Sequence, residues 1–193
     1  YFLKTLKQPY VVTVHDMIHE KFSELFSSNY RTKEFKKEVI TRADRIIAIS
    51  QNTKKDIIDI YGISDDRIEV IYHGHSHDEQ QIKPVYNLPK KYILFVGQRD
   101  GYKNFGRLLR SFGRLHEKYP EIRLVCTGQS FNKQEMADIN ALGLADSVFR
   151  YFVSDSQLTF LYKNAVCFVF PSLYEGFGIP ILESFAAGCP LAL

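Results

Sequence analysis

The stretch that decides the fold is Phe170-Pro171-Ser172-Leu173-Tyr174-Glu175-Gly176-Phe177-Gly178-Ile179-Pro180-Ile181-Leu182-Glu183. A run of β-forming residues, 166–170, stops at Pro171, and an apolar helical pattern begins at Pro180, a residue that suits the first turn of a helix. Two glycines flank a phenylalanine in the loop between them. The pattern predicts a strand, a glycine-rich loop and a helix, in that order.

The same loop carries the elements of a ligand site. Free backbone N–H groups at the start of a helix attract anions, and glycines let a ligand approach the backbone closely. Glu175 lies in the loop, and Glu183 lies about one turn into the helix, eight positions later. Carboxylates beside an anion site are unfavourable unless they bind hydroxyl groups of the same ligand. Phosphate on N–H groups and hydroxyls on carboxylates together indicate a sugar nucleotide.

Composition limits the class of protein. A chain of 193 residues fits one large or two small domains, and 45% hydrophobic residues suffice for a packed core. Lys and Arg exceed Asp and Glu by 25 − 22 = 3, so nucleic-acid binding is not demanded. The longest apolar run, 165–170, is too short to cross a bilayer, and no signal peptide is recognisable.

The cysteines and the chain ends give two further expectations. Cys126, Cys167 and Cys189 lie in apolar contexts without metal-ligand spacing, which predicts reduced, buried thiols in a cytoplasmic protein. The chain begins at Tyr1 and stops within an expected strand near Pro190, so we expect a piece of a longer protein.

The first part of the chain alternates strands with helices. After the first expected strand, at 10–14, the stretch from His15 to Asn29 is expected to be irregular. Ser50 suits a helix cap and Gly62 a helix end. Strands are expected at 10–14, 45–49 and 67–72, and helices at 31–41 and 52–61. This alternation predicts parallel βαβ units.

The composition changes after the third strand. Residues 74–89 lack periodicity and are predicted to link a domain at 1–73 to another at 90–193. His73, His75 and His77 alternate, which would place three imidazoles on one side of an extended chain. Three such histidines could form a metal site, but no cysteine or fourth ligand accompanies them, so we expect no metal there.

The second part has a more regular alternation. Strands are expected at 92–96, 122–126, 148–151, 166–170 and near 190, and helices at 104–118, 132–142, 154–164 and 181–187. The pattern predicts a doubly wound α/β domain. Ligands in such sheets bind beyond the carboxyl ends of the strands, which here are marked by Gly97, Thr127, Val153 and Pro171.

These motifs resemble the retaining glycosyltransferases of family 4, which have the two-domain GT-B fold. Glu175 and Glu183 match the family's E-x7-E pattern, with the glycines and Pro171 in place. Three further stretches carry the likeness: Phe95-Val96-Gly97-Gln98-Arg99-Asp100-Gly101-Tyr102-Lys103-Asn104-Phe105, Ala43-Asp44-Arg45-Ile46-Ile47-Ala48-Ile49-Ser50 and Val70-Ile71-Tyr72-His73-Gly74.

The resemblance implies an activity and a division of labour. The N-terminal domain would bind a saccharide or lipid-linked acceptor, and the C-terminal domain a nucleotide-sugar donor. The implied enzyme is a hexosyltransferase-type glycosyltransferase of polysaccharide or glycoconjugate biosynthesis that retains the anomeric configuration. The first Rossmann-like strands are missing, so we expect this piece to be inactive alone. Peripheral membrane association through the missing N-terminal part is also compatible with the resemblance.

The resemblance also implies roles for basic residues. Arg99 and Lys103 flank a helix start and would hold the donor diphosphate and stabilise the leaving group. Alternatively, both are solvated surface cations. Because the chain has no Asp-x-Asp motif, we expect no metal and no cofactor besides the donor substrate.

The remaining site residues come from the strand ends. Glu183 would bind the ribose hydroxyls, and Glu175 would face the transferred sugar. The backbone N–H groups of Gly176, Phe177 and Gly178 would bind sugar hydroxyls or phosphate, with the Phe177 ring in packing. His15 resembles the histidine that contacts the donor sugar, and the backbone around Val153 would contact the base. Helix capping and strand-end packing are the structural alternatives for these residues.

Other classes fit less well or stay open. A dehydrogenase is disfavoured, because residues 97–101 do not form G-x-G-x-x-G and Cys126 stands where an acidic residue is needed. A sugar-nucleotide epimerase of GT-B fold remains an alternative, as does a nucleotide-sugar-binding module without activity. The sequence does not identify the sugar, the base or the acceptor.

Overall fold

The computed structural model describes residues 8–26, 31–74, 82–99 and 101–193. The chain divides into two compact units. The first comprises Tyr1–Gly74 together with the short segment Tyr174–Gly178, and the second comprises His75–Leu173 and Ile179–Leu193. The loop that carries Glu175 thus packs with the first unit, although both of its neighbours along the chain belong to the second.

The first unit is built on a parallel sheet of three strands in the order β1-β2-β3. Val12 pairs with Ile46, which pairs with Ile68 on the other side. The strands are β1 (Val11–Val14), β2 (Arg45–Ala48) and β3 (Ile68–Val70); the helices are α1 (Ile18–Lys21), α2 (Thr32–Arg42), α3 (Gln51–Tyr61) and the 3-10 turns Ser23–Leu25 and Asp65–Arg67.

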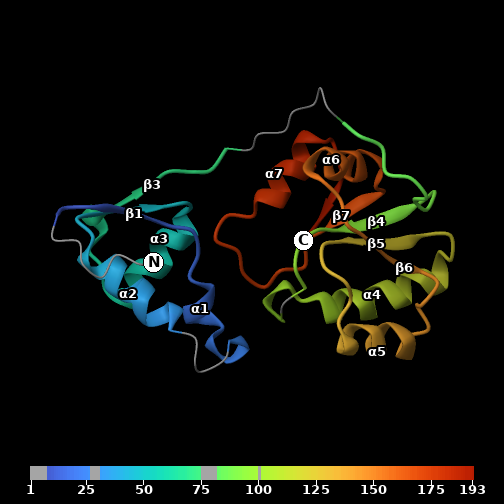
Figure 1. Ribbon diagram of the computed structural model, residues 1–193, viewed down its shortest axis with the longest axis horizontal. Coiled ribbons are helices and arrows are strands. Elements are labelled where there is room, and N and C mark those ends of the chain that lie inside the picture. The colour runs from blue at the N-terminus through green and yellow to red at the C-terminus, as the bar shows by residue number, and fades with distance from the viewer. Residues whose placement is uncertain (1–7, 27–30, 75–81, 100) are drawn as a thin grey trace. The chain divides into compact units, whose positions relative to one another are not determined.

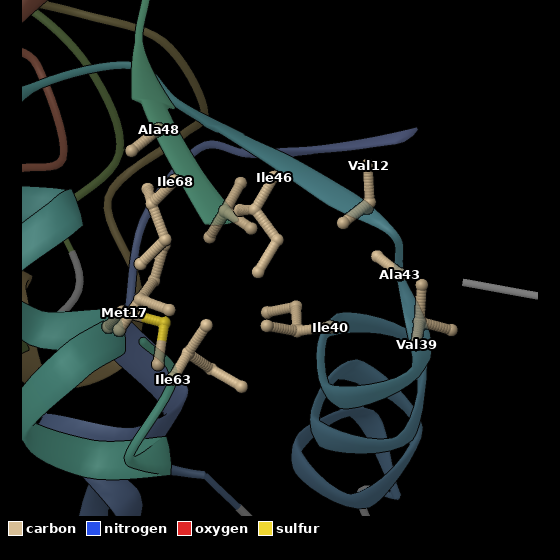
Figure 2. Packing of buried hydrophobic residues seen from close by; sticks show 11 residues of the cluster. Val12, Met17, Val39, Ile40, Ala43, Ile46, Ala48, Ile63 and Ile68 are labelled. Atoms are coloured by element: carbon tan, nitrogen blue, oxygen red, sulfur yellow. The ribbon is translucent and has the colours of Figure 1, made fainter. Parts of the chain in front are cut away.

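Branched aliphatic side chains form the core of this unit. Ile40 of α2 is fully buried and packs against the sheet residues Ile46 and Ile68, with Met17 and Ile63 closing the cluster (Figure 2). The Ser50 side chain accepts a hydrogen bond from the Thr53 backbone N–H and so caps α3, while the helix ends at Gly62. Both ends of this helix are those that the sequence predicts.

The second unit contains a parallel sheet of five strands in the order β6-β5-β4-β7-β8. Its strands are β4 (Tyr92–Phe95), β5 (Arg123–Thr127), β6 (Val148–Tyr151), β7 (Cys167–Val169) and β8 (Leu191–Ala192). Its helices are α4 (Phe105–Lys118), α5 (Lys133–Ala141), α6 (Asp155–Asn164) and α7 (Ile179–Ala186), with a 3-10 turn at Gly101–Lys103.

Alternate residues of the central strands point to opposite faces of this sheet. Ile93 and Phe95 pack under α4 and α5, whereas Tyr92 and Leu94 pack under α6 and neighbouring segments. Figure 1 shows the helices of the second unit in two layers, α4 and α5 on one side and α6 and α7 on the other. The predicted doubly wound α/β fold is confirmed.

The strand order locates the point where the winding direction reverses. From β4 the chain continues outward to β5 and β6, then returns to the opposite side of β4 to form β7 and β8. The reversal therefore lies between β4 and β7. Ligands of open parallel sheets bind at such a switch point, outside the carboxyl ends of the strands.

The structure differs from the expected elements in two places. The stretch from His15 to Asn29, expected to be irregular, contains α1 and a 3-10 turn. Within the predicted linker 74–89, Val85 and Leu88 pack against the core of the second unit, and the Lys83 N–H donates to the Ser156 carbonyl over 3.2 Å. The end of that segment is therefore part of the second unit.

Candidate functional site

The loops after β4 and β7 are tied together at the switch point. The Leu173 N–H donates to the Tyr102 carbonyl over 2.8 Å, and the Asn104 side-chain amide donates to the Pro171 carbonyl over 3.1 Å. Asn104 precedes α4 and adopts a left-handed conformation with φ 58°. These bonds fix the first turn of α4 beside the segment that follows β7.

Lys103 ends the 3-10 turn at Gly101–Lys103 and lies two residues before the start of α4. Its ammonium nitrogen lies 5.6 Å from the ring centroid of Phe170 and 5.3 Å from that of Tyr102. Both separations are within the range of cation–π attraction. The ammonium group therefore lies near the N-terminus of a 14-residue helix, where a diphosphate would be attracted by both.

Arg99 is engaged with the protein itself. Its side chain is only 5% exposed, and its Nε forms an ion pair with Glu135 Oε1 at 2.9 Å. The NH2 nitrogen donates to the Gln129 carbonyl over 2.7 Å, and the guanidinium lies 4.8 Å from the Phe131 ring centroid. Arg99 thus braces the loop after β5, and the predicted contact with a diphosphate would require it to exchange these partners.

A polar cavity of about 350 Å³ lies next to Arg99, at the ends of β4 and β5. The two loops approach each other closely, since a Cβ atom on Gly128 would lie 3.3 Å from the Gly97 carbonyl oxygen. The cavity is lined by Gln98, Arg99, Gly101, Gln129, Ser130, Asn132 and Glu135. The amide, hydroxyl and charged groups that line the cavity can form hydrogen bonds with a hydroxyl-bearing or anionic ligand.

Sequence reasoning missed Glu135. This residue closes a capping box with Asn132 at the start of α5 and also pairs with Arg99. The Asn-x-x-Glu spacing is the signal that would have located its capping role. Its pairing with Arg99, 36 positions away, had no signal in the sequence.

Glu183 lies in α7, half-buried, and its Oε2 accepts a hydrogen bond of 3.1 Å from the Tyr162 hydroxyl. Burial raises the pKa of Tyr162 far above its usual range, and the neighbouring carboxylate adds to this. A carboxylate has about four acceptor positions. One tyrosine therefore leaves Glu183 capacity for two vicinal hydroxyls.

Val153 follows β6 and is half-buried against the core. The next residue, Ser154, forms a capping box with Gln157 at the start of α6. This capping box accounts for the polar side chains at the start of α6, and helix capping is the structural alternative that the sequence predicts for them. The Val153 backbone stays a predicted base contact.

The loop with Glu175 packs within the first unit. Gly176 and Gly178 are buried, and a Cβ atom on Gly176 would lie 1.8 Å from the His15 carbonyl oxygen. Only glycine fits at that position. The Ser50 and Thr53 hydroxyls both donate to the Gly176 carbonyl, the latter over 3.2 Å.

His15 lies at the end of β1, with its side chain exposed. Its ring stacks on that of His73 at a centroid distance of 5.4 Å, and Nδ1 of His15 lies 3.4 Å from Nε2 of His73. The His73 ring in turn meets the edge of Phe177 at 5.5 Å. The structure therefore brings the predicted sugar-facing histidine to the backbone of the predicted glycine-rich loop.

A buried ion pair lies beneath this strand end. Lys36 of α2 is nearly inaccessible, and its ammonium contacts Glu20 at 2.9 Å and Asp16 at 3.5 Å. Asp16 also accepts the Ile18 N–H over 3.0 Å. These contacts fix the turn that follows His15.

The site residues thus form two groups, each within one unit. Arg99, Lys103, Val153 and Glu183 lie at the strand ends and helix starts of the second unit, while His15 and residues 175–178 lie in the first. Among the described residues no cluster of three metal-ligating side chains occurs. His75 and His77 lie outside the described residues.

None of the described helices combines the length and apolar character needed to cross a membrane.

Known proteins match both parts of the chain. The model of the family described as glycosyl transferases group 1 matches residues 76–193, and that of glycosyltransferase family 4 matches residues 1–79. A serotype-specific mannosyltransferase WbdA of Escherichia coli is 30% identical over 197 residues, covering 92% of this chain and 24% of its own length. The O-antigen chain mannosyltransferase RfbU of Salmonella typhimurium is 30% identical over 184 residues, covering 93% and 50% respectively.

A solved structure agrees with the fold. Sucrose-phosphate synthase of Thermosynechococcus elongatus superposes with a TM-score of 0.73 at 20% identity, covering 97% of this chain and 50% of that one. The likeness confirms the predicted GT-B class of fold. The chain spans about a quarter to a half of the length of the curated relatives described above.

Proposed function

Since the chain belongs to the glycosyl transferases group 1 family, we propose that it supplies the donor half of an enzyme that transfers a hexosyl group from a nucleoside diphosphate sugar to a saccharide or lipid-linked acceptor. The observation that carries this proposal is the position of Lys103. A cation at the β4–β7 switch point, at the start of α4, is suited to a diphosphate.

The names of two relatives support a role in polysaccharide biosynthesis. Both the WbdA and the RfbU proteins are mannosyltransferases, and the second acts on O-antigen chains. We therefore place the whole protein in polysaccharide biosynthesis, with mannose as the first sugar to test. Its cytoplasmic location is part of the proposal and is supported by three free cysteines.

The chemistry follows from the side chains present. Departure of a nucleoside diphosphate leaves negative charge on phosphate oxygens and positive charge on the sugar ring. Lys103 and the N-terminus of α4 stabilise the negative charge on the phosphate oxygens. The Glu175 carboxylate faces the positive charge on the sugar ring. Glu183 holds the ribose through its remaining acceptor positions. Transfer proceeds with retention of the anomeric configuration and without a metal ion.

Product analysis tests this assignment. The full-length protein that contains this sequence is incubated with isotopically labelled UDP-, GDP- and ADP-hexoses and an oligosaccharide or lipid-linked acceptor. The expected result is one labelled glycoside with the donor's anomeric configuration. Epimerised nucleotide sugar, an inverted product or transfer that stops when divalent metal is chelated would contradict the proposal.

The 193-residue chain itself provides a second test. We expect it to bind nucleoside diphosphate weakly and to transfer no sugar. A thermal-shift screen of UDP, GDP and ADP would identify the base, and turnover by this chain alone would contradict the expectation.

A further inference from the structure

One buried carboxylate in the first unit holds the loop that carries Glu175. Asp56 of α3 is 5% exposed, and its two oxygens have different partners. The Lys21 ammonium lies 2.7 Å from Oδ1, and the Tyr174 hydroxyl donates to Oδ2 over 2.6 Å. The same hydroxyl accepts the Met17 N–H over 3.3 Å.

The tyrosine ring is enclosed as well. Tyr174 is 8% exposed, with the Lys21 ammonium 4.9 Å from its ring centroid and the Phe22 ring at 6.1 Å. Burial raises the pKa of Tyr174 far above its usual range, and the hydrogen bond to Asp56 adds to this. The hydroxyl therefore remains a donor throughout the physiological pH range.

The burial of Asp56 together with its charged partner Lys21 calls for an explanation. Burying a carboxylate and an ammonium is costly, and apolar residues of similar size would often fill the space as stably. A buried polar network, however, admits only one arrangement of its donors and acceptors. Such specificity is useful where a loop must be held in one position.

The backbone around Glu175 is fixed on both sides of that residue. Tyr174 precedes it in the Asp56 cluster, and the Gly176 carbonyl that follows accepts from Ser50 and Thr53. The Asn52 side-chain amide donates to the carbonyl of Glu175 itself over 3.4 Å. Two bonded neighbours leave the intervening residue little backbone freedom.

We propose that Lys21, Asp56 and Tyr174 form a latch that positions Glu175. These three are positioning residues, because in this proposal they act only by holding the residue next to Glu175. Their catalytic significance rests on the proposed function, in which Glu175 faces the transferred sugar, whereas the latch itself is a property of the folded chain.

Proteolysis tests the latch without any enzymatic activity. A protease specific for glutamate cuts after Glu175 only when the loop opens, so the rate at which the bond between Glu175 and Gly176 is cleaved, followed by mass spectrometry, reports the opening equilibrium. In the 193-residue chain, Tyr174→Phe and Asp56→Asn should each raise that rate about tenfold, because the first removes the hydrogen bond to the Asp56 carboxylate and the second removes the charge that strengthens it. The control Tyr10→Phe removes a tyrosine hydroxyl bond of 2.8 Å to Val39 in the same unit and should leave the rate unchanged.

Kinetics of the full-length transferase test the positioning role. Tyr174→Phe should lower kcat about tenfold while the affinity for nucleoside diphosphate changes less than about twofold, because Lys103 and Glu183, the proposed contacts to the diphosphate and the ribose, lie in the second unit. A merely structural role would not produce this separation. The Tyr10→Phe variant again serves as control.

The outcomes are distinct. Unchanged cleavage at Glu175 in both variants would overturn the latch. Faster cleavage with unchanged kcat would overturn the positioning role. A wild-type protein that transfers no hexose would contradict the proposed function, and the cleavage rates would then still decide whether the latch exists.

Discussion

Arg99 and Glu135 form a largely buried ion pair, with 2.9 Å between the guanidinium Nε and the carboxylate Oε1. The pair joins the loop after β4 to the start of α5, and it borders the polar cavity. Glu135 therefore links the fold of the second unit to the residues that surround its candidate site.

Removing one partner of this pair should destabilise the second unit. Glu135→Ala leaves the Arg99 guanidinium buried without its counter-charge, and we expect a loss of about 3 kcal/mol in the free energy of unfolding. Urea denaturation of the 193-residue chain measures the loss. Glu121→Ala is the matched control: its pair with Lys91 is more than half exposed and screened by solvent, so a much smaller loss is expected. Equal losses in the two variants would contradict the structural role of Arg99.

Lys103→Ala should weaken nucleotide binding. Loss of a charge-assisted contact to a diphosphate should raise the dissociation constant for the preferred nucleoside diphosphate at least about tenfold. Isothermal titration calorimetry of the full-length protein gives this constant. Lys118→Ala, at the opposite end of α4, removes the same charge from an exposed position and should have little effect. Unchanged affinity in Lys103→Ala would remove this residue from the site.

Gly176→Ala should displace the loop that carries Glu175. The new Cβ atom would lie 1.8 Å from the His15 carbonyl oxygen, so one of the two backbones must move. We expect a lower melting temperature and faster cleavage after Glu175, with a cost of at least about 2 kcal/mol. Gly113→Ala provides the comparison, because its nearest neighbour would be 3.9 Å away and alanine favours the helix there. A Gly176→Ala protein as stable as the wild type would show that the loop is not held against His15.

Stability should fall at alkaline pH. Burial raises the pKa of Tyr92 well above its usual value, so in the folded protein its hydroxyl keeps its proton where an unfolded tyrosine, with a pKa near 10, loses it. The stabilising contribution is thus complete below about pH 10 and decreases as the pH rises further, by up to about 1.4 kcal/mol per pH unit for each such tyrosine.

Denaturation between pH 9 and 11 measures this slope. Tyr92→Phe should make it shallower, because the variant lacks one group that binds its proton more tightly in the folded state. The same variant at pH 7 separates the effect from loss of the hydroxyl's bond to the Leu161 carbonyl, 2.8 Å long in the structure. An unaltered slope in Tyr92→Phe would contradict the assignment.

Much of the fold could be predicted because its determinants are local. The cap at Ser50 and the end at Gly62 set the limits of α3, and short runs of β-branched and apolar residues locate the strands to within about two residues. The four-residue helix Ile18–Lys21 escaped prediction because it is too short to show a helical period. Its position depends on packing, which includes the contact of Lys21 with Asp56.

The sequence by itself determined the parallel α/β class, the order of the elements and the motif that pairs Glu175 with Glu183. Backbone preferences and the periodicity of apolar residues act over a few positions, so one chain suffices to recognise them. Tertiary structure alone decided the partners. Arg99 meets Glu135 at a separation of 36 residues, and Tyr174 meets Asp56 at a separation of 118. Contacts at such separations arise only when the folded sheets and helices bring distant side chains together, and no local pattern encodes them.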